Sequence, residues 1–174
     1  LINSIDEINV PLLETCNVIN INNTNRIIGF NNIISMNNLN IFADNVTGFN
    51  SLQSVNIDLN IHNSINGFNS LTTFPSNYSS SSLESFKGFN AVTQINGNLT
   101  IQSDTIDAFK SLTQVNGDII LTGINISGFG ALQSTQNITI NASGNIPQFN
   151  TLTTINKISI SSPQAINGFN SIQT

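Results

Sequence analysis

Charge is the scarcest property of this sequence. Aspartate, glutamate, lysine and arginine together make up 7% of its 174 residues, against about 25% in an ordinary globular domain. The four basic residues are scattered through the chain, and the net charge is −5. Nucleic-acid binding requires clustered lysine and arginine. The composition therefore excludes a nucleic-acid partner.

Cysteine, histidine and long apolar runs are also rare or missing. Cys16 is the single cysteine, which excludes a disulfide within the chain, and its place in an apolar ladder predicts a buried, inert thiol. His62 is the only histidine, so the sequence offers neither a zinc cluster nor a Ser-His-Asp or Cys-His arrangement. No run approaches the ~18 apolar residues of a membrane-spanning helix. We expect no metal, no cofactor and no membrane span in this segment.

Asparagine, serine and threonine supply the polar surface instead, with 32, 21 and 16 residues. Asparagine-rich sequences are often disordered, but 39% of this chain is hydrophobic, which favours a folded chain.

The length of the chain predicts a single domain, residues 1–174. The sequence has no initiating methionine or signal peptide and begins and ends in mid-pattern, so we expect it to be part of a longer array or assembly.

A repeat of about twenty residues organises the chain. A phenylalanine, usually within Gly-Phe-Asn-Ser-Leu, marks each copy, and the intervals between these residues are 19, 19, 21, 20, 20, 20 and 20 residues. The marking residues are Phe30, Phe49, Phe68, Phe89, Phe109, Phe129, Phe149 and Phe169. A period this regular predicts a solenoid or a similar array.

Apolar residues recur at fixed positions within each copy. Two ladders follow the phenylalanine by three and by six residues, and a short alternating segment such as "LTI" (99–101) or "ITI" (138–140) comes next. Alternation at period two, β-branched residues and Asn-Gly turns are typical of strands rather than helices. We therefore expect an all-β, right-handed parallel β-helix, a leucine-rich-repeat-like solenoid of eight to nine coils of about 20 residues stacked at the ~4.8 Å strand spacing.

Glycine and asparagine mark the corners of the expected coil. Glycine precedes most of the marking phenylalanines and asparagine follows most of them. Both residue types tolerate left-handed backbone geometry, so we expect positive φ to be preferred before the phenylalanine and asparagine to close the corner. Asparagine side chains stacked in register can also form amide ladders along the rod.

One coil breaks the rule. The segment "PSNYSSSSLESFKG" (75–88) creates the 21-residue interval and puts Tyr78 and Ser80 where strand residues should be apolar. The irregular coil near residues 75–83 therefore predicts a bulge or an outward loop. Such a loop could be a contact site, with Tyr78, Ser79 and Ser80 as its candidate residues, or simply a tolerated insertion.

The repeat resembles a known family. The order I-x-G-F-x-x-L-x-x-I-x-G-x-L-x-I is clear in "FKGFNAVTQINGNLTI" (86–101) and "IDAFKSLTQVNGDIIL" (106–121). It is similar to the receptor L domain, a leucine-rich-repeat-like right-handed β-helix found in the ligand-binding lobes of growth-factor receptors and in many surface proteins. The resemblance implies an extracellular or cell-surface protein. Growth-factor receptors of this type carry disulfides and helical caps, which this chain lacks, so simple surface arrays are the closer likeness.

Catalysis finds little support in the residue types. An enzyme on this scaffold would need carboxylates gathered on one face, and only Asp104 and Asp107 share a short segment, which we interpret as a solvated loop. Sequons for N-glycosylation occur as often as chance predicts. Among them Asn45, Asn77 and Asn125 are the candidates, because we place them in loops. No catalytic, cofactor or metal residue is assigned.

The sequence favours a non-enzymatic, extracellular structural and adhesive repeat scaffold of a cell-surface or filament-forming protein. Its uncharged, amide-rich face suits a protein or carbohydrate ligand, and its coils suit end-to-end self-association. The alternative is a ligand-binding ectodomain of a receptor. An ice-binding solenoid is a third hypothesis, which the outward mid-strand residues disfavour because they form no regular threonine array.

Overall fold

The computed structural model describes residues 5–74, 77–166 and 169–172. Within these ranges the chain forms β-strands and contains no helix. The strands are β1 (Ile5–Val10), β2 (Val18–Gly29), β3 (Ser35–Gly48), β4 (Ser54–Gly67), β5 (Thr73–Phe74), β6 (Tyr78–Gly88), β7 (Gln94–Ile95), β8 (Leu99–Ala108), β9 (Gln114–Val115), β10 (Ile119–Gly123), β11 (Asn125–Gly128), β12 (Asn137–Ala142) and β13 (Lys157–Ser161).

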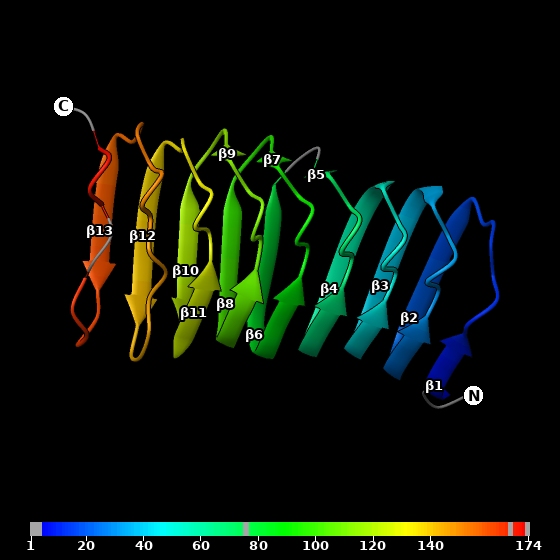
Figure 1. The fold of residues 1–174 in the computed structure, drawn as a ribbon. Helices are drawn as coiled ribbons and strands as arrows, with labels where there is room; N and C mark the ends of the chain where they lie inside the picture. The colour runs from blue at the N-terminus through cyan, green and yellow to red at the C-terminus, as the bar shows by residue number, and fades with distance from the viewer. Residues whose placement is uncertain (1–4, 75–76, 167–168, 173–174) are drawn as a thin grey trace.

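The strands build one long sheet and one narrow sheet. The long sheet runs β1-β2-β3-β4-β6-β8-β10-β12-β13, with β11 also paired to β8, and the narrow sheet runs β5-β7-β9. Each pairing is parallel and joins residues about one repeat apart, as between Ile119 and Ile138. Figure 1 shows the strands side by side along a rod, from β1 near the N-terminus to β13 near the C-terminus.

The architecture is the expected right-handed parallel β-solenoid with a spacing of roughly 20 residues. Seven strands of the long sheet lie between β1 and β13, so the rod has about seven full turns between its end coils. Counting both end coils reaches the eight to nine that the repeat predicts. A chain that rises one coil at a time turns right-handed because strands twist that way.

The core is a set of stacked apolar columns inside the coil. In β8 the side chains of Leu99, Ile101 and Ile106 are fully buried, whereas Gln102 is exposed. This alternation arises because successive side chains of a strand point to opposite faces. The marking phenylalanines form the largest column, in which the rings of Phe49 and Phe68 stack with centroids 5.1 Å apart. The sequence ladders therefore become the core directly.

The corner before this column differs from the expectation. Gly48, Gly67, Gly88 and other glycines that precede the phenylalanine have positive φ, as predicted. The next residue with positive φ is the phenylalanine itself, however, with φ between 54° and 58° at Phe30, Phe49, Phe68, Phe89, Phe109 and Phe129. No asparagine among the described residues has positive φ. The expectation that asparagine adopts the left-handed backbone geometry at this corner is therefore wrong.

Burial explains why a phenylalanine accepts this strained geometry. A left-handed conformation costs a non-glycine residue about 1–2 kcal/mol, and burying a phenylalanine side chain returns about 1.5–3 kcal/mol. The conformation also aims the backbone N–H of Phe49 at the carbonyl oxygen of Gly29 one coil earlier, at 3.0 Å. Leu52 then donates its N–H to the Phe49 carbonyl oxygen at 3.2 Å, which closes a tight turn with Asn50 inside it.

The irregular coil contains a bulge and not an outward loop at Tyr78 and Ser80. Tyr78 and Ser80 pair with Leu99 and Ile101 of β8, and the register shifts between Ser80 and Leu83. That bulge absorbs the extra residue of the 21-residue interval. The Tyr78 side chain is buried, with its ring centroid 5.1 Å from that of Phe74. Of the two alternatives that the sequence left open for this segment, the bulge is confirmed. The outward loop is wrong for Tyr78 and Ser80.

Candidate functional site

The outer face of the long sheet is rich in uncharged polar side chains. Asn20 and Asn40, on β2 and β3, point away from the core, and their side chains share a hydrogen bond of 2.8 Å. Further along the rod the outward positions carry Thr100, Gln102, Thr122, Thr139, Asn141, Ser159 and Ser161, with the exposed Ile120 among them. Two charged residues are also exposed on this stretch of the long sheet, Asp104 on β8 and Lys157 on β13.

A second polar column follows the phenylalanine corner. Asn31, Asn50, Asn69 and Asn90 form what we call the asparagine ladder, in which each side-chain amide donates to the Oδ1 atom of the preceding one. The three N–O distances are 3.3, 2.8 and 3.1 Å. The amide ladder expected from the sequence is therefore confirmed for these four residues. Because each side chain is held by its neighbours, the ladder is ordered before any partner arrives.

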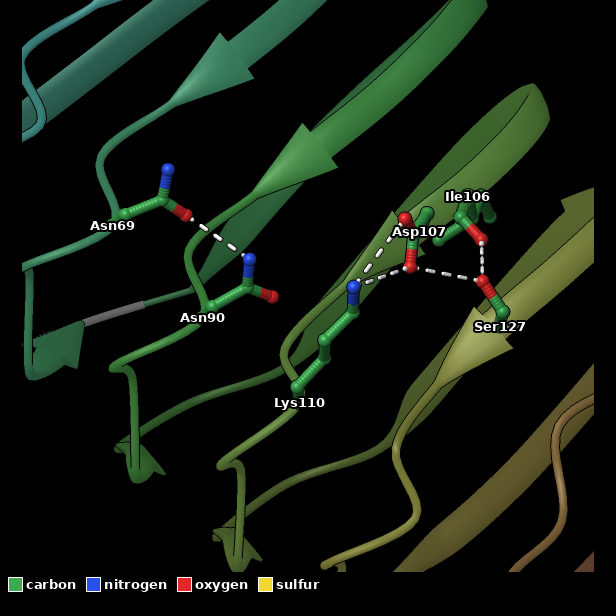
Figure 2. A network of polar contacts seen from close by, with 6 residues as sticks. All are labelled: Asn69, Asn90, Ile106, Asp107, Lys110 and Ser127. Carbon is green, nitrogen blue, oxygen red and sulfur yellow. Dashed lines mark hydrogen bonds and ion pairs between the residues drawn. The ribbon is translucent and has the colours of Figure 1, made fainter.

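Lys110 occupies the next position and ends the ladder (Figure 2). Its Nζ atom lies 3.2 Å from Oδ1 of Asp107, three residues earlier. Oδ1 of Asp107 also lies 3.1 Å from the Ser127 hydroxyl of the following coil. Asp107 therefore has two polar partners, which hold its side chain at the end of β8.

Two other carboxylates, those of Asp104 and Asp118, have surroundings different from those of Asp107. Asp104 lies in β8, not in the expected loop, and lines an open hollow of about 370 Å³ together with Glu84, Gln102 and Thr122. Asp118 instead accepts a hydrogen bond from the side-chain amide of Asn137 at 2.7 Å. In the part of the chain that the structure describes, no group of three or more histidine, cysteine, aspartate or glutamate side chains could hold a metal ion.

The candidate glycosylation residues have different surroundings. Asn45 is half-buried within β3, not in a loop, and its amide nitrogen, the atom that a glycan would occupy, donates to the carbonyl oxygen of Asn25 at 3.3 Å. Asn77 and Asn125 are exposed, although Asn125 begins strand β11 and does not lie in the expected loop. Both accept hydrogen bonds through Oδ1, from the backbone N–H groups of Asn98 and Asn145. The surroundings of Asn77 and Asn125 are thus better suited to modification than those of Asn45.

The candidate contact residues are mostly inside the coil. Tyr78 and Ser80 face the core, and only Ser79 is exposed. Burial raises the pKa of the Tyr78 phenol above its usual range, while the neighbouring Ser80 hydroxyl opposes that shift. Cys16 packs against the core but is only partly buried, and its Sγ atom lies 3.2 Å from the Val18 carbonyl oxygen.

Two further outward features are a column of threonines, which the sequence did not reveal, and a pair of aromatic rings whose mutual packing it did not reveal. Thr72, Thr93, Thr113 and Thr153 form a column on the narrow-sheet side, with Gln133 interrupting it. Their hydroxyls are partly used within the rod, since Thr113 donates to the Thr93 carbonyl oxygen at 2.9 Å. Phe42 and His62 project from β3 and β4 on the long sheet with ring centroids 4.6 Å apart. The alternation of "NIFAD" (40–44) was the available signal for the second feature.

Comparisons with known proteins provide no relative. No family model matches the chain, and neither the curated proteins nor the solved structures contain a significant match. Among the described residues, no helix has the length and apolar character needed to cross a membrane. The polar columns and the outward aromatic pair are therefore the features from which a function can be derived.

Proposed function

We propose that this chain is a non-enzymatic, extracellular structural and adhesive scaffold of a cell-surface or filament-forming protein. The observation that carries the proposal is the asparagine ladder, because it shows polar side chains organised along the rod and bonded to one another. A surface whose side chains are already fixed loses little conformational entropy when it binds. Hydrogen bonds between neutral groups are also insensitive to the salt that screens charges.

The parallel stacking supports a role in assembly. Ile138 and Ile140 of β12 are buried, whereas Ile158 and Ile160, their partners in β13, are only half-buried. A further coil laid against β13 would bury these side chains and pair the strand edge. In this proposal that coil belongs either to a longer array or to a neighbouring molecule stacked end to end. The resemblance of the sequence repeat to receptor L domains is consistent with such an array, and we include it in this proposal.

Surface labelling tests the proposed location. Antibodies against the folded chain should bind intact, unpermeabilised cells of the native source, and an external protease should remove the signal. Labelling that requires permeabilised cells would contradict an extracellular role. Electron microscopy of the native material should show rods or filaments if the coils continue or stack, whereas isolated short monomers would contradict the assembly part alone.

The threonine column is the observation that favours ice binding as a second candidate. Thr93 and Thr113 stand one coil apart, as their N–H to carbonyl hydrogen bond shows, so the column repeats at the ~4.8 Å strand spacing. Against this candidate, Thr113 and Thr153 direct their hydroxyls to carbonyl oxygens of the rod. A thermal-hysteresis measurement decides: a freezing point depressed below the melting point, and lost in Thr93→Val, would favour ice binding over the scaffold.

A further inference from the structure

Phe42 is placed on the outer face of β3, where the core does not need it. The alternation of this strand buries Leu39, Ile41 and Ala43 and leaves Asn40 exposed and Phe42 half-exposed. The described marking phenylalanines from Phe30 to Phe149 are buried. A phenylalanine that remains partly in water forgoes part of the free energy that full burial provides. The outer face of β3 therefore carries one aromatic ring that the core does not use.

Phe42 is one side of an L-shaped arrangement. The ring of His62, from the next coil, stands at 85° to the Phe42 ring with the centroids 4.6 Å apart. Nδ1 of His62 lies 3.4 Å from Oδ1 of Asp44, and both of these side chains are about half-exposed. We call Phe42, His62 and Asp44 the aromatic corner. It presents an apolar ring, a second ring perpendicular to it and a carboxylate within one small area.

Amides are frequent around the aromatic corner, and one further acidic residue, Asp58 of β4, pairs in register with Asn40. Asn40, two residues before Phe42 on the same face, shares its amide hydrogen bond with Asn20. An amide offers donors and acceptors together, and a carboxylate accepts two or more hydrogen bonds. A protein partner would need a wider apolar centre, since protein interfaces bury an apolar core inside a polar rim. A single outward ring among hydroxyls and amides does not supply that centre.

A hexopyranose ring matches these features. Its C–H groups form an apolar face that packs on an aromatic ring, and its hydroxyls bond to carboxylates and amides at the edge. We propose that the aromatic corner binds a neutral, β-linked hexopyranose chain, with one sugar ring against Phe42, its hydroxyls on Asp44 and the chain continuing over the Asn20–Asn40 amides. The proposal rests on the adhesive part of the proposed function. Both β-glucans and N-acetylglucosamine polymers present such C–H faces and hydroxyls.

The experiment is an amide-detected NMR titration of the 174-residue protein with three tetrasaccharides in separate arms. Cellotetraose and laminaritetraose represent the two glucan linkages, and chitotetraose represents the N-acetylglucosamine polymers. At least one of them should shift resonances of Phe42, His62 and Asp44 in a saturable manner. Phe42→Ala should weaken that binding at least about fivefold, because stacking on an aromatic ring contributes about 1 kcal/mol beyond its buried area. The matched control Thr122→Ala, an outward substitution on β10, should leave the affinity unchanged.

Each outcome decides the proposal. Absence of saturable shifts with all three saccharides at 10 mM would overturn it, as would shifts located away from β3 and β4. If the Phe42→Ala variant does not fold, which the loss of its dispersed spectrum would show, Asp44→Asn is measured instead. This variant retains the Phe42 ring and should weaken binding several-fold. Unchanged binding in Asp44→Asn would also overturn the proposal. A surface-labelled protein that binds no saccharide would refute this inference and leave the scaffold proposal standing, whereas an intracellular protein would refute the scaffold.

Discussion

Asn90 and Lys110 occupy the same corner of consecutive coils, but they do not bond to each other. Oδ1 of Asn90 is buried and has no hydrogen-bond partner in the part of the chain that the structure describes. Nζ of Lys110 binds Asp107 instead, at 3.2 Å (Figure 2). The asparagine ladder therefore ends on an unsatisfied acceptor, and a buried acceptor of this kind costs about 1–3 kcal/mol.

Lys110→Asn should stabilise the protein by about 1 kcal/mol. The new side-chain amide would stand where the ladder continues and could donate to Oδ1 of Asn90. The variant loses the ion pair with Asp107, but an exposed pair contributes only about 0–1 kcal/mol. Urea denaturation measures the change in the free energy of unfolding. Lys110→Ala, which loses the pair without supplying a donor, is the control, and an asparagine variant no more stable than this control would contradict the mechanism.

Gly88→Ala should destabilise the rod by about 2–4 kcal/mol, from backbone strain together with steric overlap. Gly88 has a φ of 107°, and an added Cβ would overlap the carbonyl oxygen of Gly67 in the previous coil. Gly130→Ala is the matched control, because a Cβ there meets nothing within 4 Å. Thermal or urea unfolding compares the two variants. Equal stabilities would show that the corner relaxes freely, contrary to the stacked geometry.

Phe68→Ala should destabilise the protein by about 3–5 kcal/mol, because it opens a cavity in the phenylalanine column. The Phe68 ring is fully buried and stacks on Phe49 and Phe89 at centroid distances of 5.1 and 5.0 Å. Phe42→Ala removes the same side chain from the outer face and should cost less than about 1.5 kcal/mol. Chemical denaturation of both variants tests the division between core and surface phenylalanines. A larger cost at Phe42 would reverse that division.

Tyr78 predicts a loss of stability at alkaline pH. Burial raises the pKa of its phenol above the ordinary value of 10.0, so the unfolded chain releases this proton at a lower pH than the folded chain does. The contribution is complete below pH 10 and falls as pH rises above it, by at most about 1.4 kcal/mol per pH unit. Wild type and Tyr78→Phe contain the same lysines, so the titration of lysine affects both proteins equally. The difference in unfolding free energy between the two proteins should therefore change only above pH 10, and a constant difference up to pH 11 would contradict the burial.

The fold was predictable because the repeat fixes it. Residues such as Leu112, Leu132 and Leu152 recur one coil apart, and stacking identical positions is the arrangement that buries them all. The positive φ of Phe68 was not predictable from residue preferences, because side-chain burial overrides the local preference of its backbone. The sequence left Tyr78 open between a bulge and an outward loop, because it did not show that the ring fits among Phe74, Phe86 and Phe89.

The candidate site was predictable only in part. Asparagine ladders follow from spacing alone, since residues one period apart must be neighbours in a solenoid. The link between His62 and Asp44 depends on the irregular register between β3 and β4 near Ala43 and Asn45. A regular period does not reveal such a shift. For the same reason, the sequence placed Phe42 outward without showing that His62 stands perpendicular to it.

The stacking of one coil on the next is the claim on which every proposal here depends. Pulsed electron paramagnetic resonance tests it with pairs of spin labels on the exposed column of Gln53, Thr113, Gln133 and Thr153, in a Cys16→Ser background. From Gln53 these positions lie three, four and five coils away along the hydrogen-bonded column. At the ~4.8 Å strand spacing, the backbone separations should be about 14, 19 and 24 Å. Distances that rise by one strand spacing per coil are the predicted result, and distances that do not increase with coil number would contradict the solenoid.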